Sequence, residues 1–64
     1  MKRLKELREE KSLTQAQLAK ELGLDYTTIG KYENGSREPS LEMVKKICRF
    51  FGVTTDFLLE MSDD

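Results

Sequence analysis

The stretch from Thr14 to Gly35 reads TQAQLAKELGLDYTTIGKYENG, and three residues in it restrict how the chain can fold. Ala19 lies midway along a predicted helix, where its small side chain lets a second helix cross closely. Gly23 follows that helix, where a left-handed residue turns the chain at little steric cost. Ile29 lies on the inner face of the next helix and can fill the angle between the two. The pattern therefore predicts two short helices joined at a steep angle by a tight turn.

Such a pair of helices is the helix-turn-helix unit, whose second helix enters the DNA major groove. Helical spacing directs Leu18, Leu22, Leu24 and Tyr32 inward. The outward residues are low in acid and rich in hydrogen-bonding groups, which suit phosphates and base edges; they are Gln15, Gln17, Tyr26, Thr27, Thr28 and Lys31. The alternative interpretation is an ordinary helical hairpin in a small bundle.

Caps and apolar periodicity predict five helices and no strand, so the expected fold class is all-α. The helices are expected at residues 2–10, 15–22, 26–33, 41–51 and 55–60. Four N-caps support these starts: Thr14, Asp25, Ser40 and Thr54.

Two of these helices carry specific expectations about burial. In 41–51 the apolar residues follow the three-four spacing of a buried stripe, comprising Leu41, Val44, Ile47, Cys48 and Phe51. The basic residues Lys45, Lys46 and Arg49 are expected to form a solvated face. In 55–60, Phe57 and Leu59 are expected in the core, whereas Leu58 and Met61 fall on the outer face.

Length and charge set the remaining limits. The 64 residues allow one domain, taken as 1–60, followed by a short acidic tail at 61–64. The net charge of −1 is less basic than is typical of a DNA-binding domain. Residues 1–40 carry eight basic and seven acidic side chains, and residues 41–64 carry three and five. Specific contacts must therefore contribute more than general phosphate attraction.

Several classes of protein are not expected from this composition. The chain has no histidine, no glycine-rich phosphate loop and no metal-ligand spacing, so neither an enzyme nor a metal, cofactor or small-molecule site is expected. One cysteine permits no intramolecular disulfide, and no apolar run approaches the roughly 20 residues of a membrane span. A cytoplasmic protein is expected.

Four segments carry a family resemblance: Leu7-Arg8, TQAQLAKELGL, IGKYENGSREPS and FGVTTDFLL. With them the chain resembles the Cro/C1-type (Xre-like) helix-turn-helix regulators related to lambdoid phage repressors, from about Leu4 to Leu59. The resemblance implies a compact five-helix, lambda-repressor-like domain. It also implies a transcriptional repressor that binds double-stranded DNA as a homodimer, on a pseudo-palindromic operator, with its third helix in the major groove.

The resemblance also implies roles for single residues. Gln15 matches a glutamine that contacts phosphate and braces the recognition helix, and Arg8 and Glu33 match a partly buried ion pair. Base and nearby phosphate contacts are implied for Tyr26, Thr27, Thr28 and Lys31, and further phosphate contacts for Asn34, Ser36 and Arg37. The dimer contact is expected at Thr55, Leu58 and Met61, with the loop 35–40. Among the base contacts, Lys31 is assigned to the O6 and N7 acceptors of guanine, and Thr28 can meet a thymine methyl group.

Three questions stay open at this stage. Tyr26 either reaches phosphate or sugar, or only shields the turn. Gly30 costs a helix about 1 kcal/mol relative to alanine, and either a close approach to DNA or tolerance in a packed helix would explain it. An antitoxin-like module, whose main partner is a protein, could carry this same domain.

Overall fold

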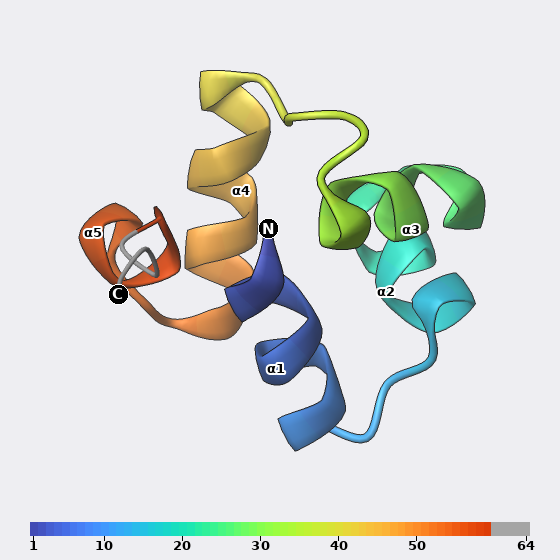
Figure 1. The fold of residues 1–64 in the computed structure, drawn as a ribbon. Helices are drawn as coiled ribbons and strands as arrows, with labels where there is room; N and C mark the ends of the chain where they lie inside the picture. The colour runs from blue at the N-terminus through green and yellow to red at the C-terminus, as the bar shows by residue number, and fades with distance from the viewer. Residues whose placement is uncertain (60–64) are drawn as a thin grey trace.

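The computed structural model of the chain describes residues 1–59, and within that range it contains five helices and no strand (Figure 1). They are α1 (Lys2–Glu10), α2 (Gln15–Leu22), α3 (Tyr26–Asn34), α4 (Leu41–Phe51) and α5 (Thr55–Leu59). The predicted all-α fold and its order of helices are confirmed. The third helix ends one residue later than predicted, at Asn34.

Side-chain caps start four of the helices where the sequence predicts them. Thr14 and Gln17 form a capping box before α2: the Thr14 hydroxyl accepts from the Gln17 N–H at 3.0 Å, and Gln17 Oε1 accepts from the Thr14 N–H at 2.8 Å. Asp25, Ser40 and Thr54 each accept from a backbone N–H in the first turn of α3, α4 and α5. These bonds satisfy amides that have no partner within the helix.

The turn between α2 and α3 has the predicted conformation. Gly23 adopts a left-handed φ of +73°, and its N–H bonds to the Lys20 carbonyl. Ala19 and Ile29 are both buried where α2 and α3 meet, and Leu24 is half-buried beside them. The three residues that define the motif therefore do what their size and spacing predict.

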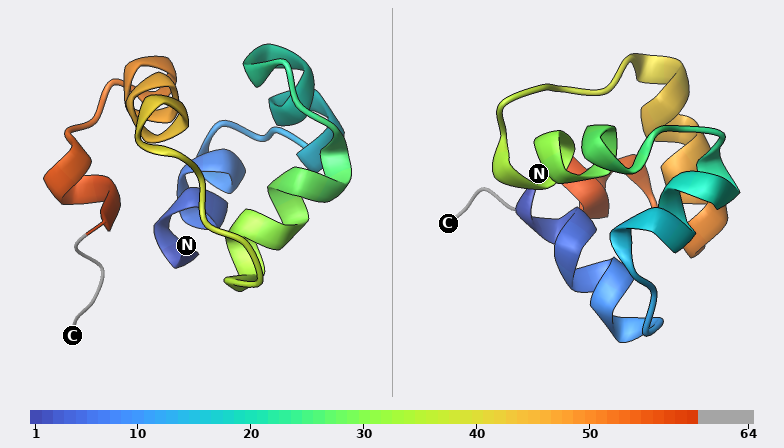
Figure 2. Two further views of the ribbon diagram at one scale, coloured as in Figure 1. Left: turned by 90° about the horizontal axis from the view of Figure 1, so that it is seen from above. Right: turned by 90° about the vertical axis from the view of Figure 1, so that its right-hand side faces the viewer.

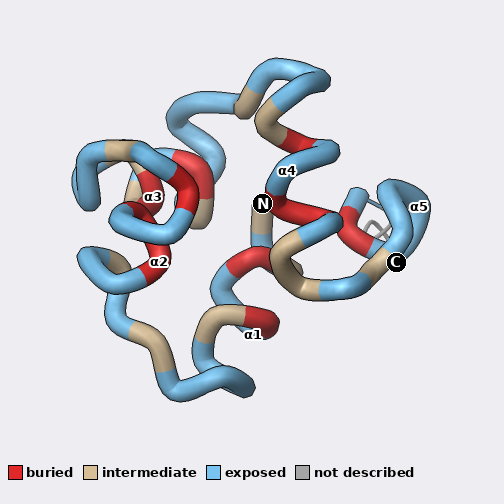
Figure 3. Tube along the Cα trace, turned by 180° about the vertical axis from the view of Figure 1, so that it is seen from behind, coloured by how far each residue is buried: buried red, intermediate tan, exposed pale blue. Residues whose placement is uncertain are grey.

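The core lies where the inner faces of all five helices converge (Figure 3). In Figure 1 and the left view of Figure 2, the α2–α3 pair lies to one side of α1, and α4 and α5 lie to the other. α1 packs against both α3 and α5. The fully buried side chains come from every helix: Leu4, Leu18, Leu22, Ile29, Ile47 and Leu58. Within residues 1–59, no helix has the length and hydropathy needed to cross a membrane.

In α5 the buried and exposed positions are the reverse of those expected from the sequence. Leu58 is fully buried, whereas Phe57 and Leu59 expose 40% and 51% of their surface. A five-residue helix that starts at Thr55 turns a single position into the core, and that position is the fourth residue of α5. Phe57 instead lies at the solvent boundary, with the Arg3 guanidinium 4.5 Å from its ring centroid. Met61 lies outside the described residues.

Two residues of α4 also differ from expectation. Leu41 was expected in the buried stripe but is 67% exposed, because it is the first residue of α4 and burial begins one turn later, at Val44. Lys46 was expected only in solvent, yet its ammonium donates to the Leu22 carbonyl at 3.0 Å. This bond satisfies a carbonyl at the end of α2 and ties α4 to the turn of the motif.

Cys48 packs in the core, as its place in the stripe predicts. Burial raises the pKa of its thiol, because the thiolate would lose its hydration there. The residue therefore serves as a small apolar group and is a poor nucleophile in the folded domain.

Candidate nucleic-acid interface

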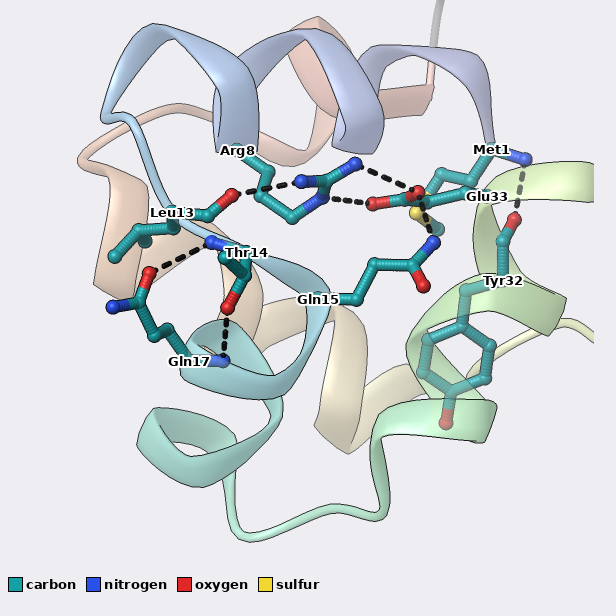
Figure 4. A network of polar contacts seen from close by, with 8 residues as sticks. All are labelled: Met1, Arg8, Leu13, Thr14, Gln15, Gln17, Tyr32 and Glu33. Atoms are coloured by element: carbon teal, nitrogen blue, oxygen red, sulfur yellow. Dashed lines mark hydrogen bonds and ion pairs between the residues drawn. The ribbon is translucent and has the colours of Figure 1, made fainter.

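The expected ion pair between Arg8 and Glu33 is present and joins α1 to the end of α3 (Figure 4). Arg8 Nε donates to Glu33 Oε2 at 2.6 Å, and a second guanidinium nitrogen donates to Oε1 at 3.3 Å. The side chains are only 11% and 5% exposed. The hydrogen bond to Glu33 raises the pKa of Arg8, although burial acts in the opposite direction.

Two further bonds extend this pair into a network. Arg8 also donates to the Leu13 carbonyl at 2.7 Å, which fixes the chain just before α2. From the first position of α2, Gln15 Nε2 donates to Glu33 Oε1 at 3.0 Å. Every polar atom of the Glu33 carboxylate thus has a donor, and the network holds α1, α2 and α3 in one arrangement.

Gln15 therefore braces α3, which agrees with one of the roles that the family resemblance implies for it. Its amide lies across α3 beside Gly30: a Cβ placed on Gly30 would lie 3.5 Å from Nε2 and 3.7 Å from Oε1 of Gln15. The sequence suggested two explanations for Gly30, a close approach to DNA and tolerance in a packed helix. Neither of them includes this contact with the Gln15 side chain.

The exposed side chains of α3 lie on the face turned away from the core. Tyr26 is 58% exposed, Thr27 and Lys31 are exposed, and Thr28 is half-buried. Positions three and four apart share a helix face, so Thr27 and Lys31 are neighbours, as are Tyr26 and Gly30. Asp25 caps the helix, and its carboxylate accepts a hydrogen bond from the Thr27 N–H. The face combines hydroxyl groups, one ammonium and one phenol.

The segment after α3 folds back on the end of the helix. Gly35 adopts a left-handed φ of +83°, and the Arg37 N–H bonds to the Lys31 carbonyl at 3.2 Å. Asn34 Oδ1 accepts from the Ser36 N–H at 2.8 Å, so the Asn34 amide is oriented with its NH₂ group available to donate. The side chains of Ser36 and Arg37 are exposed beside it. This turn presents donors only a few residues from the exposed face of α3.

Three structural roles here were missed from the sequence. Gln17 completes the capping box, which the Thr-x-x-Gln spacing could have indicated. The Met1 ammonium donates to the Tyr32 carbonyl at 2.7 Å near the end of α3. Lys46 holds the end of α2. No sequence signal identifies the last two, because each contact joins residues far apart in the chain.

The nine residues assigned to DNA thus lie at the start of α2, along α3 and in the turn that follows. They are Gln15, Gln17, Tyr26, Thr27, Thr28, Lys31, Asn34, Ser36 and Arg37. In the same range of 1–59, no three His, Cys, Asp or Glu side chains gather in a way that could hold a metal ion.

Comparison with known proteins identifies a family. Residues 4–58 match the helix-turn-helix family. The HTH-type transcriptional activator BcrR of Enterococcus faecalis is 47% identical over 89% of this chain. An uncharacterized HTH-type transcriptional regulator of Methanocaldococcus jannaschii is 42% identical over 97% of this chain and 94% of its own length. No solved structure gives a significant match.

More distant relatives carry other roles. The cryptic phage CTXphi transcriptional repressor RstR of Vibrio cholerae is 34% identical over 95% of this chain. The antitoxin PezA of Streptococcus pneumoniae is 36% identical over 83% of this chain. The chain spans only part of several of these relatives: 28% of BcrR, 55% of RstR and 34% of PezA. The shared part is the helix-turn-helix domain.

Proposed function

The chain belongs to the helix-turn-helix family of Cro/C1-type regulators, and from this premise we propose that it is a sequence-specific DNA-binding transcriptional regulator. α3 enters the major groove, and the protein acts in the cytoplasm. The observation that carries the proposal is the exposed face of α3, which the Arg8–Glu33–Gln15 network holds rigidly against α1 and α2. A rigid helix is needed because base edges are read by hydrogen bonds of fixed geometry.

The exposed groups divide into two sets by position. Thr27, Thr28 and Lys31 project from α3 itself and are assigned to base edges, with Lys31 reading guanine. Gln15 and the turn residues Asn34 and Arg37 flank the helix and are assigned to phosphates. Phosphate contacts fix the register of a protein on DNA but carry no sequence information.

The regulator is proposed to act as a homodimer on a pseudo-palindromic operator, with two copies of α3 about 34–36 Å apart. Leu58 cannot supply the contact because it is buried in the core. The structure instead offers a groove of about 530 Å³ between the 35–39 segment, α4 and α5. Its lining includes Leu41 and Leu59, which are the more exposed of its leucines. These two residues, with Thr55, are the proposed contact in place of Leu58.

Repression is the favoured outcome of binding, since a phage repressor is among the relatives, although the relative named BcrR is an activator. A second candidate is an antitoxin-like role, which the similarity to PezA supports. The two candidates differ in what the domain binds when DNA is absent. A neighbouring small gene whose product binds this chain would favour the antitoxin role.

Selection from a random duplex library tests the DNA-binding proposal. We expect enrichment of one site with two-fold symmetry, bound by two protomers in sedimentation. Leu59→Glu should weaken binding and leave the domain folded, whereas Lys45→Glu, an exposed change elsewhere on the surface, should keep the dimer. Enrichment of no sequence would refute the proposal, and one protomer on an asymmetric site would refute the dimer.

A further inference from the structure

Gly30 lies on α3 beside its exposed face and is itself half-buried. Its neighbours one turn away are Tyr26 and Thr27 on one side and Glu33 and Asn34 on the other. All of these carry polar side chains, and Gly30 alone carries none. Glycine in a helix is unfavourable, so its presence here needs a compensating role.

The space above Gly30 is filled by a side chain from a different helix. The three atoms nearest to an ideal Cβ on Gly30 all belong to the Gln15 amide, at 3.5 Å (Nε2), 3.7 Å (Oε1) and 3.9 Å (Cδ). These are ordinary van der Waals distances for one methyl group, but they leave no room for γ carbons on the same side. Gly30 is half-buried although it has no side chain.

The orientation of that amide is set by Glu33. A carboxylate only accepts hydrogen bonds, so the amide must turn its NH₂ group toward Glu33, to which Nε2 donates at 3.0 Å (Figure 4). Arg8 holds the same carboxylate through both of its oxygens. One N–H of the Gln15 amide is thereby used, and the second remains available to a phosphate oxygen, which also only accepts.

We propose that Gly30 is a positioning residue for DNA binding: it seats the Gln15 amide on the face of α3, where Glu33 orients it to donate to the DNA backbone. The proposal rests on the proposed function, and it assigns the glycine to an internal contact rather than to direct approach of DNA. The recognition surface then includes a group from α2 in the place where α3 lacks a side chain.

Two substitutions separate seating from helix propensity. Gly30→Ala adds one methyl group at ordinary contact distance from the amide, so the amide should stay in place. Gly30→Val adds two γ carbons on a stiff χ1 angle. At least one of them must point toward the Gln15 amide and displace it. Neither residue is a poorer helix former than glycine, and both variants should fold.

The first measurement uses the free protein. The side-chain NH₂ resonances of Gln15 in ¹⁵N NMR should be almost unchanged in Gly30→Ala. In Gly30→Val they should move toward those of a solvated glutamine. Resonances that stay in place in Gly30→Val would overturn the seating role, whatever the protein binds.

The second measurement is binding to the duplex selected with the wild-type protein. Gly30→Ala should bind as the wild type does, and Gly30→Val and Gln15→Ala should each lose about tenfold, as for one charge-assisted hydrogen bond. The double variant Gly30→Val/Gln15→Ala should lose little more than either single variant. Losses that multiply would show that residue 30 acts on DNA directly and would overturn the proposal. Failure of the wild type to select any duplex would refute the proposed function, and the NMR result would still decide the seating of the amide.

Discussion

Replacing Glu33 by glutamine tests the network that holds α3 against α1 and α2. Both carboxylate oxygens are engaged: Oε2 accepts from Arg8 Nε, and Oε1 accepts from a second Arg8 nitrogen and from Gln15 Nε2. Glutamine keeps the shape of the side chain but has one oxygen and one NH₂ group. In either orientation Glu33→Gln therefore turns an NH₂ group toward a donor, and it removes the carboxylate that is hydrogen-bonded to the Arg8 guanidinium.

The expected cost follows from the burial of the pair. Exposed ion pairs are worth about 0–1 kcal/mol, whereas breaking a buried pair costs about 3–5 kcal/mol. Side-chain exposures of 11% and 5% place this pair near the buried limit. Because glutamine retains one acceptor, we expect a loss of about 3 kcal/mol, at the lower end of that range. A 64-residue domain has a free energy of unfolding of roughly 3–10 kcal/mol, so the variant should lose a large share of the stability of the domain.

Urea melts followed by far-UV circular dichroism measure this loss. Glu6→Gln is the matched control, since Glu6 forms an exposed i,i+3 pair with Arg3 at 3.3 Å, and it should lose about 1 kcal/mol at most. Arg8→Met should also destabilise, and the double variant Arg8→Met/Glu33→Gln should lose about 2 kcal/mol less than the sum of the single losses. Strictly additive losses, or a Glu33→Gln loss equal to that of the control, would refute the reasoning.

Three further predictions concern the core and the helix ends. Cys48 should react slowly with an aromatic disulfide reagent until urea unfolds the domain. Because folding raises the pKa of its thiol, the unfolded chain loses the thiol proton first, and the urea midpoint should fall as the pH rises through the raised pKa. The fall should be smaller in Cys48→Ala. Lys46→Met should cost about 1 kcal/mol by freeing the Leu22 carbonyl, whereas Lys45→Met should leave the melt unchanged. Leu58→Ala should cost about 2–5 kcal/mol, and Leu59→Ala should stay within about 0.5 kcal/mol in the same melts.

The helices and the central turn could be predicted because their signals are local. Caps such as Thr14 and Ser40 and the left-handed Gly23 act within a few residues of where they stand. The faces of α5 could not be predicted in the same way. Five residues give little more than one helical turn, so the apolar pattern does not repeat, and packing against the other helices decides that Leu58 is inside and Leu59 outside.

The candidate site was predictable to a similar degree. Exposed positions on α3 follow from helical spacing, and the Arg8–Glu33 pair was implied by the family resemblance. The role of Lys46 and the contact of Gln15 with Gly30 depend on side chains that meet across helices, and no local pattern encodes them. The same limit applies to Leu41, whose spacing fits the buried stripe although it is 67% exposed at the first position of α4.

The division of labour on the DNA face is the central claim, and a salt series on two duplexes tests it most directly. The wild type, Lys31→Ala and Arg37→Ala would be bound to the selected operator and to a scrambled duplex. Arg37→Ala should weaken binding to both duplexes alike, and it should reduce the slope of log affinity against log salt concentration by about one. Lys31→Ala should weaken the operator by about 1–3 kcal/mol, relax preference at one base pair in each half-site and leave the scrambled duplex almost unaffected. Equal losses on both duplexes for Lys31→Ala would make Lys31 a phosphate contact and contradict the account.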